Sequence, residues 1–356
     1  MKLDNILQKS FASLLLKWNS EYNSRQMPWK GQKDPYKIWL SEIILQQTRV
    51  EQGLKYYNKF LEAFPDVHAL ANAPEQVVYK LWEGLGYYTR CRNLIKSANY
   101  ISKKRNGSFP ENYDEILKLD GVGQYTASAI ASFAYNHSHA VVDGNVFRVL
   151  SRIFGITIPI DSSEGKTFFY DLANKLLDKQ NPGLYNQAIM DFGALICKPL
   201  PLCAICVFRE NCYAFQYRKI TELPVKEKKI VVKKRWFYYL ILESRDSVAV
   251  RQRQYNDIWH NLFEFYLVEK PDVNTYGSIL SQAEEDGILR KNHYEMVSVS
   301  KVYKQKLSHQ VISGQFINVK LKRKLKLNGG LEWYAKANLL KLAFPKFINQ
   351  YRENIT

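Results

Sequence analysis

The chain has 356 residues, of which 46% are hydrophobic, and a formal net charge of +17. Its length predicts about two domains, and its apolar content excludes disorder throughout the chain. No run approaches the roughly 18 apolar residues of a membrane-spanning helix, so we expect a cytoplasmic protein. The charge indicates a polyanionic partner, and nucleic acid is favoured over a membrane surface because the basic residues are dispersed.

Helical patterns fill the first 215 residues of the chain. The N-terminal stretch is amphipathic, and Asp34 before a proline predicts the N-cap of a second helix. Thr48 and Glu51 match a T-x-x-E capping box, which predicts a new helix start and a break near Gln46–Gln47. Further helices are expected at about 75–83, 89–104, 113–119, 124–135, 145–154, 164–178 and 183–196.

The periodicity changes in the last third of the chain. Residues 218–235 are charged and poor in large apolar side chains, which predicts a linker. After it come the β-rich runs "WFYYLILE", "SVAVRQR", "LFEFYLVE", "EMVSVSKVY" and "SGQFINVKL", and a late helix in "ANLLKLAFPKF". We therefore expect a mainly α region over 1–217 and an α+β domain over 236–356.

The segment "ILKLDGVGQYTASAIASF", residues 116–133, predicts a helix, a Gly-Val-Gly turn and a second helix. Gly121 and Gly123 allow a close backbone approach, and the amides that open the second helix can bind a phosphate. This pattern is typical of sequence-neutral DNA binding by a helix-hairpin-helix. An ordinary helical hairpin with glycine at its corner is the alternative.

Two carboxylates stand out on either side of this hairpin. Asp143 in "VVDGNVFRVLSR" precedes a helix, where the N-terminus favours the ionised form; a plain N-cap is the alternative. Glu42 in "SEIILQQT" lies on an otherwise apolar helix. If Glu42 is buried its pKa rises and it can act as a general acid, whereas on the polar stripe it is a surface residue.

Four of the five cysteines follow the spacing C-x5-C-x2-C-x5-C. Disulfides are disfavoured in a reducing compartment, and structural zinc sites usually pair their ligands in two short knuckles. A compact loop with four thiolates favours a 4Fe–4S cluster over zinc. The predicted ligands are Cys197, Cys203, Cys206 and Cys212, and the isolated Cys91 is interpreted as a buried apolar thiol.

The helix-hairpin-helix, the downstream Asp143 and the cysteine loop, in that order, resemble the endonuclease III superfamily of DNA glycosylases. Within it, "WLSEIILQQTRV", "LWEGLGYYTRCRNL" and "VVDGNVFRVL" are similar to motifs of the MutY family of adenine DNA glycosylases. The resemblance runs from about "MPWK" through Cys212, and more weakly through the C-terminal domain. It implies a base-excision repair enzyme that removes adenine opposite 8-oxoguanine and, more weakly, opposite guanine. We expect a monomer bound to double-stranded DNA and associated with the nucleoid through it.

The resemblance implies roles for four catalytic residues. Glu42 would protonate the flipped adenine at N7, and ionised Asp143 would stabilise the positive charge left on the deoxyribose. Asn145 and Tyr125 would orient the site. Members that also cleave the DNA backbone carry a lysine where this chain has Tyr125, so we expect base hydrolysis without strong lyase activity.

Further residues are implied to handle the flipped base and the base opposite it. Gln47 would fill the space that the flipped base leaves, and Leu85 and Tyr87 would wedge beside the opposing base. Thr48 is predicted to bind the substrate. The ones that frame the adenine are Arg25, Trp29 and Gln187. The ones that match the lesion-reading loop, in "KLSHQVISGQF", are Ser308 and His309.

The family's C-terminal domain has a Nudix-like fold, but nothing here resembles a Nudix box, so pyrophosphatase activity is not expected. The chain departs from the family pattern at Leu307, where phenylalanine is usual, and in the first cysteine spacing, which is five residues rather than six. The alternative functions are a related glycosylase for thymine in G·T mismatches or for oxidised pyrimidines, and a non-catalytic, zinc-containing DNA-binding protein.

Overall fold

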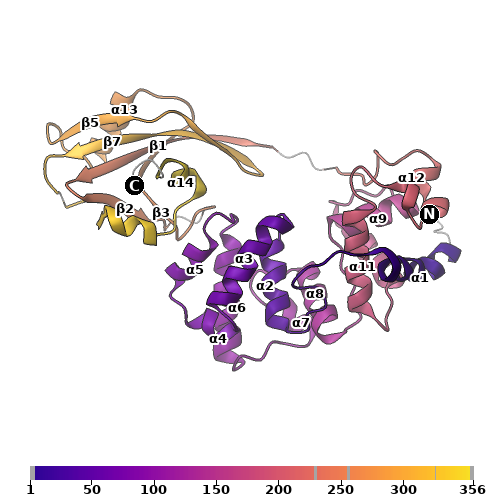
Figure 1. Cartoon of the computed structure of the whole chain (residues 1–356). Coiled ribbons are helices and arrows are strands. Elements are labelled where there is room, and N and C mark those ends of the chain that lie inside the picture. Colours follow the sequence, from indigo (N-terminus) through magenta and orange to yellow (C-terminus); the bar gives the residue numbers. More distant parts are fainter. Residues whose placement is uncertain (1–4, 228–230, 255–256, 325, 353–356) are drawn as a thin grey trace. The chain divides into compact units, whose positions relative to one another are not determined.

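A computed structural model describes residues 5–227, 231–254, 257–324 and 326–352 (Figure 1). The chain divides into two compact units. The first comprises Met1–Ala71 and Lys96–Lys229, and the second comprises Asn72–Ile95 and Ile230–Thr356. The chain changes unit at 71/72, 95/96 and 229/230, and only the last of these positions lies in the segment predicted as a linker. Residues 228–230 lie outside the described part of the chain, and the linker stays a prediction.

The first unit is helical, as the periodicity predicted. Its helices are α1 (Asn5–Tyr22), α2 (Pro35–Leu45), α3 (Val50–Ala63), α4 (Val67–Asn72), α7 (Tyr113–Leu117), α8 (Gln124–Tyr135), α9 (Gly144–Phe154), α10 (Ser163–Leu176), α11 (Pro182–Leu195) and α12 (Tyr213–Gln216). Helix α6 (Thr89–Lys104) runs from the second unit into the first. Among the described residues, no helix combines the length and apolarity needed to cross a membrane.

The predicted helix break after α2 is confirmed, but the capping box is wrong. Asp34 caps α2 by accepting a hydrogen bond from the Tyr36 N–H at 2.9 Å. Gln47 then takes a φ of 55°, which ends the helical path. The Thr48 hydroxyl donates to the Gln46 carbonyl at 3.3 Å, so α3 begins instead after Arg49, which makes no side-chain cap bond.

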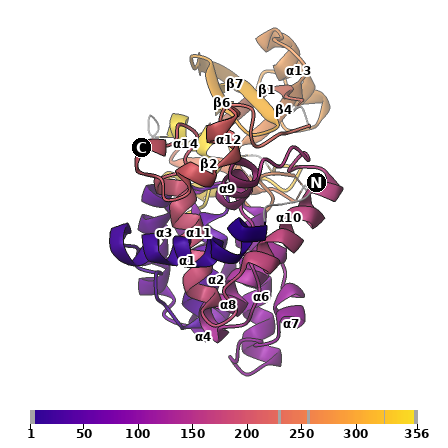
Figure 2. The ribbon, with the colours of Figure 1, turned by 90° about the vertical axis from the view of Figure 1, so that its right-hand side faces the viewer.

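Helix α1 joins α9, α10 and α11 in one core (Figure 2). Its apolar stripe is buried at Leu7, Phe11, Leu15 and Trp18. Phe11 stacks on Phe208, from the cysteine-rich segment, with ring centroids 4.8 Å apart. This core therefore holds α9, α11 and the cysteine-rich segment together.

The second unit contains a mixed sheet. Its strands are β1 (Lys233–Ser244), β2 (Ser247–Gln252), β3 (Phe263–Glu264), β4 (Tyr266–Lys270), β5 (Tyr294–Val299), β6 (Tyr303–Lys306), β7 (Gln310–Leu321) and β8 (Glu332–Ala335). Long β1 pairs in parallel with β7 and in antiparallel with β2 and β4, while β5 and β6 pair with β7. This arrangement agrees with the expected C-terminal α+β domain.

The alternation of side chains along β1 decides which helix covers which face of the sheet (Figure 1). Tyr238 and Leu240 point into a core with α13 (Tyr276–Glu285). Tyr239 points to the other face, where it stacks on Phe316 at 5.5 Å, and Phe316 stacks on Phe347 of α14 (Lys346–Arg352) at 5.7 Å. Alternate residues of β1 thus contribute to two apolar layers, one on each face of the sheet.

The predicted late helix is wrong as one continuous element. A 3-10 helix covers Lys336–Lys341, and α14 begins directly after Pro345. Proline disfavours a helical conformation in the residue before it, so one helix cannot run through this position without a break. Four further α-helices and strands were not among those expected from the periodicity: α4, α12, α13 and β8.

The second unit includes α5 (Glu75–Trp82), which the sequence analysis placed with the helical region. The Glu83 carboxylate after α5 accepts hydrogen bonds from the Phe344 N–H and from Asn349 Nδ2, both at 2.8 Å. Lys80 Nζ donates to the Leu342 carbonyl at 3.1 Å. These polar contacts tie the segment that precedes the "GLGYY" loop to the C-terminal end of the chain.

Candidate active site

Glu42 lies on α2, a helix whose side chains are buried from Ile38 to Ile44. The side chain is 7% exposed, so the question that the sequence left open is decided in favour of burial. Burial raises the pKa of Glu42 to about 7; the Tyr125 hydroxyl lowers it and the charge of Asp143 raises it, both by less. Near neutral pH this carboxyl group can therefore hold or release a proton.

Asp143 is the N-cap of α9, the role that the sequence analysis gave as the alternative to a functional one. One carboxylate oxygen accepts from the N–H groups of Asn145 at 2.9 Å and Val146 at 2.8 Å, and the other accepts from Asn145 Nδ2 at 2.8 Å. These bonds favour the ionised form, yet burial has the larger effect, and the pKa of Asp143 lies above its ordinary value.

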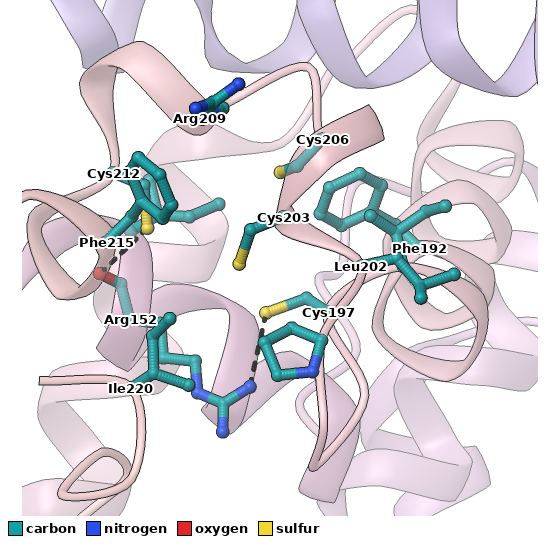
Figure 3. Close-up of a pocket in the computed structure, with 13 residues that line it drawn as sticks. Arg152, Phe192, Cys197, Leu202, Cys203, Cys206, Arg209, Cys212, Phe215 and Ile220 are labelled. Atoms are coloured by element: carbon teal, nitrogen blue, oxygen red, sulfur yellow. Dashed lines mark hydrogen bonds between the residues drawn. The ribbon is translucent and has the colours of Figure 1, made fainter. Parts of the chain in front are cut away.

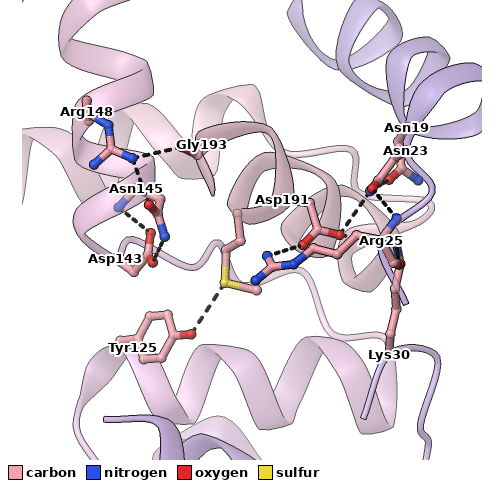
Figure 4. A network of polar contacts seen from close by, with 11 residues as sticks. Asn19, Asn23, Arg25, Lys30, Tyr125, Asp143, Asn145, Arg148, Asp191 and Gly193 are labelled. Atoms are coloured by element: carbon pink, nitrogen blue, oxygen red, sulfur yellow. Dashed lines mark hydrogen bonds and ion pairs between the residues drawn. The ribbon is translucent and has the colours of Figure 1, made fainter. Parts of the chain in front are cut away.

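Tyr125 lies in the first turn of α8 and faces both carboxylates. Burial, followed by the charges of Glu42 and Asp143, raises the pKa of its hydroxyl well above the ordinary value, so it stays protonated at neutral pH. The hydroxyl donates to Met190 Sδ on α11 at 3.4 Å (Figure 4). Helices α2, α8 and α9 thus bring together three side chains that are far apart in the sequence.

Arg148, which the sequence analysis did not single out, joins this site to the cysteine-rich segment. Its Nη2 donates to Asn145 Oδ1 and to the Gly193 carbonyl, both at 2.8 Å. Its Nε donates to the Cys197 carbonyl at 2.7 Å. Figure 4 shows the resulting line of contacts from Arg148 through Asn145 to Asp143. One guanidinium group therefore orients the amide that holds the Asp143 carboxylate.

The helix-hairpin-helix pattern is present as α7, a turn and α8. Gly121 has a φ of 77°, which a residue with a side chain rarely adopts. Gly123 caps α8 without a side-chain hydrogen bond, and a Cβ at this position would meet no atom within 4 Å. The backbone turn before α8 is therefore open, and the first N–H groups of this helix can donate hydrogen bonds to a phosphate oxygen.

The predicted adenine-framing residues lie on two segments of the first unit. Arg25 and Trp29 follow α1, and Gln187 lies on α11. The Trp29 ring packs edge-on against Tyr57 at 5.5 Å, and Arg25 pairs with buried Asp191 at 2.8 Å. Gln47 is exposed at the turn after α2.

The remaining predicted residues belong to the second unit. Leu85 is buried, whereas Tyr87 is 45% exposed and has a φ of 50°. The Tyr87 hydroxyl is hydrogen-bonded to Ser308 Oγ. Ser308 and His309 lie exposed in the turn between β6 and β7. The structure thus joins the predicted wedge residue to the predicted lesion-reading loop.

The four clustered cysteines line one pocket, and Figure 3 shows their sulfur atoms facing a common space. All of them are free thiols. Arg152 Nη1 donates to Cys197 Sγ at 3.8 Å, and Cys212 Sγ donates to the Arg152 carbonyl at 3.5 Å. In the described part of the chain, no three histidine, cysteine or acidic side chains converge closely enough to hold a single metal ion.

Comparisons with known proteins agree with this arrangement. The family model described as the HhH-GPD superfamily base excision DNA repair protein matches residues 40–166. The adenine DNA glycosylase of Buchnera aphidicola subsp. Baizongia pistaciae is 36% identical over 305 residues, which cover 84% of this chain and 83% of that protein. The adenine DNA glycosylase of Buchnera aphidicola subsp. Acyrthosiphon pisum is 30% identical over 348 residues, 97% of each chain.

A solved structure is also similar. The structure of a thermostable thymine-DNA glycosylase superposes with a TM-score of 0.55 at 30% identity, and covers 60% of this chain and 98% of that one. The two relatives that cover most of this chain are named adenine DNA glycosylases, whereas the thymine-DNA glycosylase covers a smaller part of it. Both kinds of comparison thus find DNA glycosylases.

Proposed function

Because the chain belongs to the adenine DNA glycosylase family of base-excision repair, we propose that it removes adenine opposite 8-oxoguanine and, more slowly, opposite guanine. The observation that carries this proposal is the buried Glu42 carboxyl, with a pKa of about 7, facing Tyr125 and Asp143. A proton donor and a carboxylate in one buried site are what cleavage of an N-glycosidic bond requires.

Glu42 acts as the general acid in the proposed reaction. The adenine is first rotated out of the duplex, because its glycosidic bond is not accessible within the base stack. Glu42 then transfers a proton to N7 of the adenine, which makes the base a better leaving group. The same carboxyl group, now ionised, can accept a proton from the attacking water.

Asp143 stabilises the positive charge that develops on the deoxyribose when the base departs. Its carboxylate is fixed by Asn145 and by the N-terminus of α9, so little reorganisation is needed at the moment of reaction. Tyr125 carries no amine, so the proposed reaction is hydrolysis of the base without strong cleavage of the DNA backbone.

Recognition of DNA is proposed to involve both units. The open turn at Gly121 and Gly123 would bind backbone phosphate, and Arg25, Trp29 and Gln187 would frame the adenine. Gln47 would occupy the gap left by the flipped base, and Thr48 beside it would bind the substrate. Residues of the second unit would contact the base opposite, and the hydrogen bond between Tyr87 and Ser308 supports a shared role for them.

The cysteine pocket is proposed to hold one 4Fe–4S cluster. Four thiols from one compact loop surround one space, and their spacing lacks the two short knuckles of a structural zinc site, so a 4Fe–4S cluster fits this donor set better than zinc. With all four positions filled by protein, such a cluster supplies structure rather than an open coordination site. Arg152 places positive charge beside Cys197 and would offset the cluster's negative charge.

A single-turnover assay on labelled duplexes tests the proposed function. Each sample is split, and one half is treated with hot alkali, which breaks the strand wherever a base is missing. Breaks only after alkali, in the duplex with adenine opposite 8-oxoguanine, are the expected result. Breaks in both halves would show lyase activity, and activity confined to a G·T duplex would favour the thymine-removing alternative.

A further inference from the structure

Asp191 is a buried carboxylate for which the proposed reaction has no direct use. It lies on α11 and its side chain is 0% exposed. Arg25 Nη1 lies 2.8 Å from Oδ1, while Asn23 Nδ2 at 3.0 Å and Lys30 Nζ at 3.2 Å both approach Oδ2 (Figure 4). A buried carboxylate is stable only when it is paired and hydrogen-bonded in this way.

The same group of residues holds the backbone of Arg25 as well as its side chain. The Arg25 N–H donates to Asn23 Oδ1 at 3.1 Å, and the Arg25 carbonyl accepts from Lys30 Nζ at 3.1 Å. Asn23 Nδ2 donates in turn to Asn19 Oδ1 at 2.8 Å. The N–H, the carbonyl and the guanidinium of Arg25 are therefore all bonded within one cluster, and Asp191 lies at its centre.

Helix α11 connects this cluster to the catalytic residues. Met190, the residue before Asp191, accepts the hydrogen bond of the Tyr125 hydroxyl. The carbonyl of Gly193 accepts a hydrogen bond from Arg148. Within four residues, the helix thus contacts the catalytic tyrosine, the segment that carries Arg25, and the arginine that orients Asn145.

We propose that Asp191 is the positioning residue that fixes Arg25 for base recognition, an inference that rests on the proposed function. Arg25 is a donor-only side chain, so it can bind the ring nitrogens of adenine, which accept hydrogen bonds, but not the exocyclic amine. Its side chain is 23% exposed, so it is not closed off from a ligand while Asp191 holds it. An Arg25 side chain that is already held in place increases the rate of adenine release, because it needs less ordering when the base arrives.

A double-mutant cycle tests whether Asp191 acts through Arg25. The variants are Asp191→Asn, Arg25→Met and the double variant, and the measurement is the single-turnover rate of adenine release with enzyme in excess. We expect each single variant to slow release by about 10- to 100-fold, and the double variant to stay within about threefold of the slower single variant. Independent, multiplied losses in the double variant would overturn the proposal.

A matched control separates positioning from general destabilisation. Glu264 of the second unit is also a fully buried carboxylate and is paired with Arg251 at 2.9 Å. Glu264→Gln should lower the melting temperature as Asp191→Asn does, but change the rate of adenine release by less than about threefold. If Glu264→Gln slows release as much as Asp191→Asn, the effect is one of stability and the proposal fails.

Two milder variants keep the proposal testable if Asp191→Asn does not fold. Asn23→Ala removes a hydrogen bond to Asp191 and the one to the Arg25 N–H. Lys30→Met removes an ion pair with Asp191 and the hydrogen bond to the Arg25 carbonyl. Each variant weakens the hold of the Asp191 cluster on Arg25, so each should slow adenine release with an unchanged pH profile, and unaltered rates in both would overturn the proposal. Wild-type enzyme that releases no adenine would instead contradict the proposed function itself.

Discussion

Arg148 Nη2 lies 2.8 Å from Asn145 Oδ1, and the amide of Asn145 in turn lies 2.8 Å from the Asp143 carboxylate. The guanidinium that makes this contact also binds the Cys197 carbonyl at 2.7 Å. One side chain and one amide therefore connect the cysteine-rich segment to the proposed catalytic carboxylate.

Replacing Arg148 by methionine should slow base removal by about 10- to 100-fold, because Asn145 loses the contact that orients its amide. Single-turnover rates on the duplex with adenine opposite 8-oxoguanine measure this effect. Arg235→Met is the matched control, since Arg235 is a partly buried arginine paired with Glu269 at 2.7 Å in the second unit. Equal rates for Arg148→Met and wild type would mean that Asn145 needs no such support.

The rate of base removal should depend on pH through both carboxyl groups. In the proposed reaction Glu42 donates a proton only while protonated, so the rate should fall as the pH rises through about 7. Asp143 is proposed to act while ionised, so the rate should also fall as the pH drops through its pKa, which burial places above the ordinary value. Glu42→Gln should abolish most activity and the alkaline limb together; a persistent alkaline limb in the residual rate would assign it to another group.

Gly193→Ala should slow base removal by disturbing Asn145. A Cβ on Gly193 would lie 2.7 Å from Asn145 Cβ and 3.1 Å from its carbonyl oxygen, so α11 and α9 would have to separate. We expect a loss of about 1–3 kcal/mol in stability together with slower release. Gly277→Ala, where a Cβ meets no atom within 4 Å, is the control for thermal denaturation and should be nearly neutral.

Cys206→Ser should remove the proposed 4Fe–4S cluster from the purified protein. Iron and acid-labile sulfide are measured alongside zinc, and visible absorbance is recorded before and after chelation. Wild type should contain iron and sulfide, and Cys206→Ser should lose most of both because one of four thiolate ligands is missing. Cys91→Ala should keep them, since Cys91 is buried elsewhere. Stoichiometric zinc in colourless wild type would instead identify a zinc site.

Glu83→Ala should loosen the C-terminal end of the chain. Without the carboxylate, the Phe344 N–H and the Asn349 amide lose their acceptor at 2.8 Å. Amide hydrogen exchange should therefore become faster in peptides that contain residues 342–352. Glu285→Ala, on the exposed side of α13, is the control, and equal exchange in the two variants would show that Glu83 does not hold this end.

The sequence by itself determined most helices and strands, because apolar periodicity and capping residues are local signals. It also identified Glu42, Asp143 and the cysteines as residues of interest, since their types and spacing point to acid–base and metal chemistry. It could not decide whether Glu42 is buried, because burial depends on which face of α2 packs against other helices.

Only the tertiary structure could identify Asp191 and Arg148. Asp191 lies in "MDFGALIC" without a local signal, and its partner Arg25 is 166 positions away along the chain. Arg148 reads as an ordinary polar residue of a helix until folding brings the Cys197 carbonyl to it. Buried polar networks are formed by distant segments, so the physical reason that these residues matter exists only once the core has assembled.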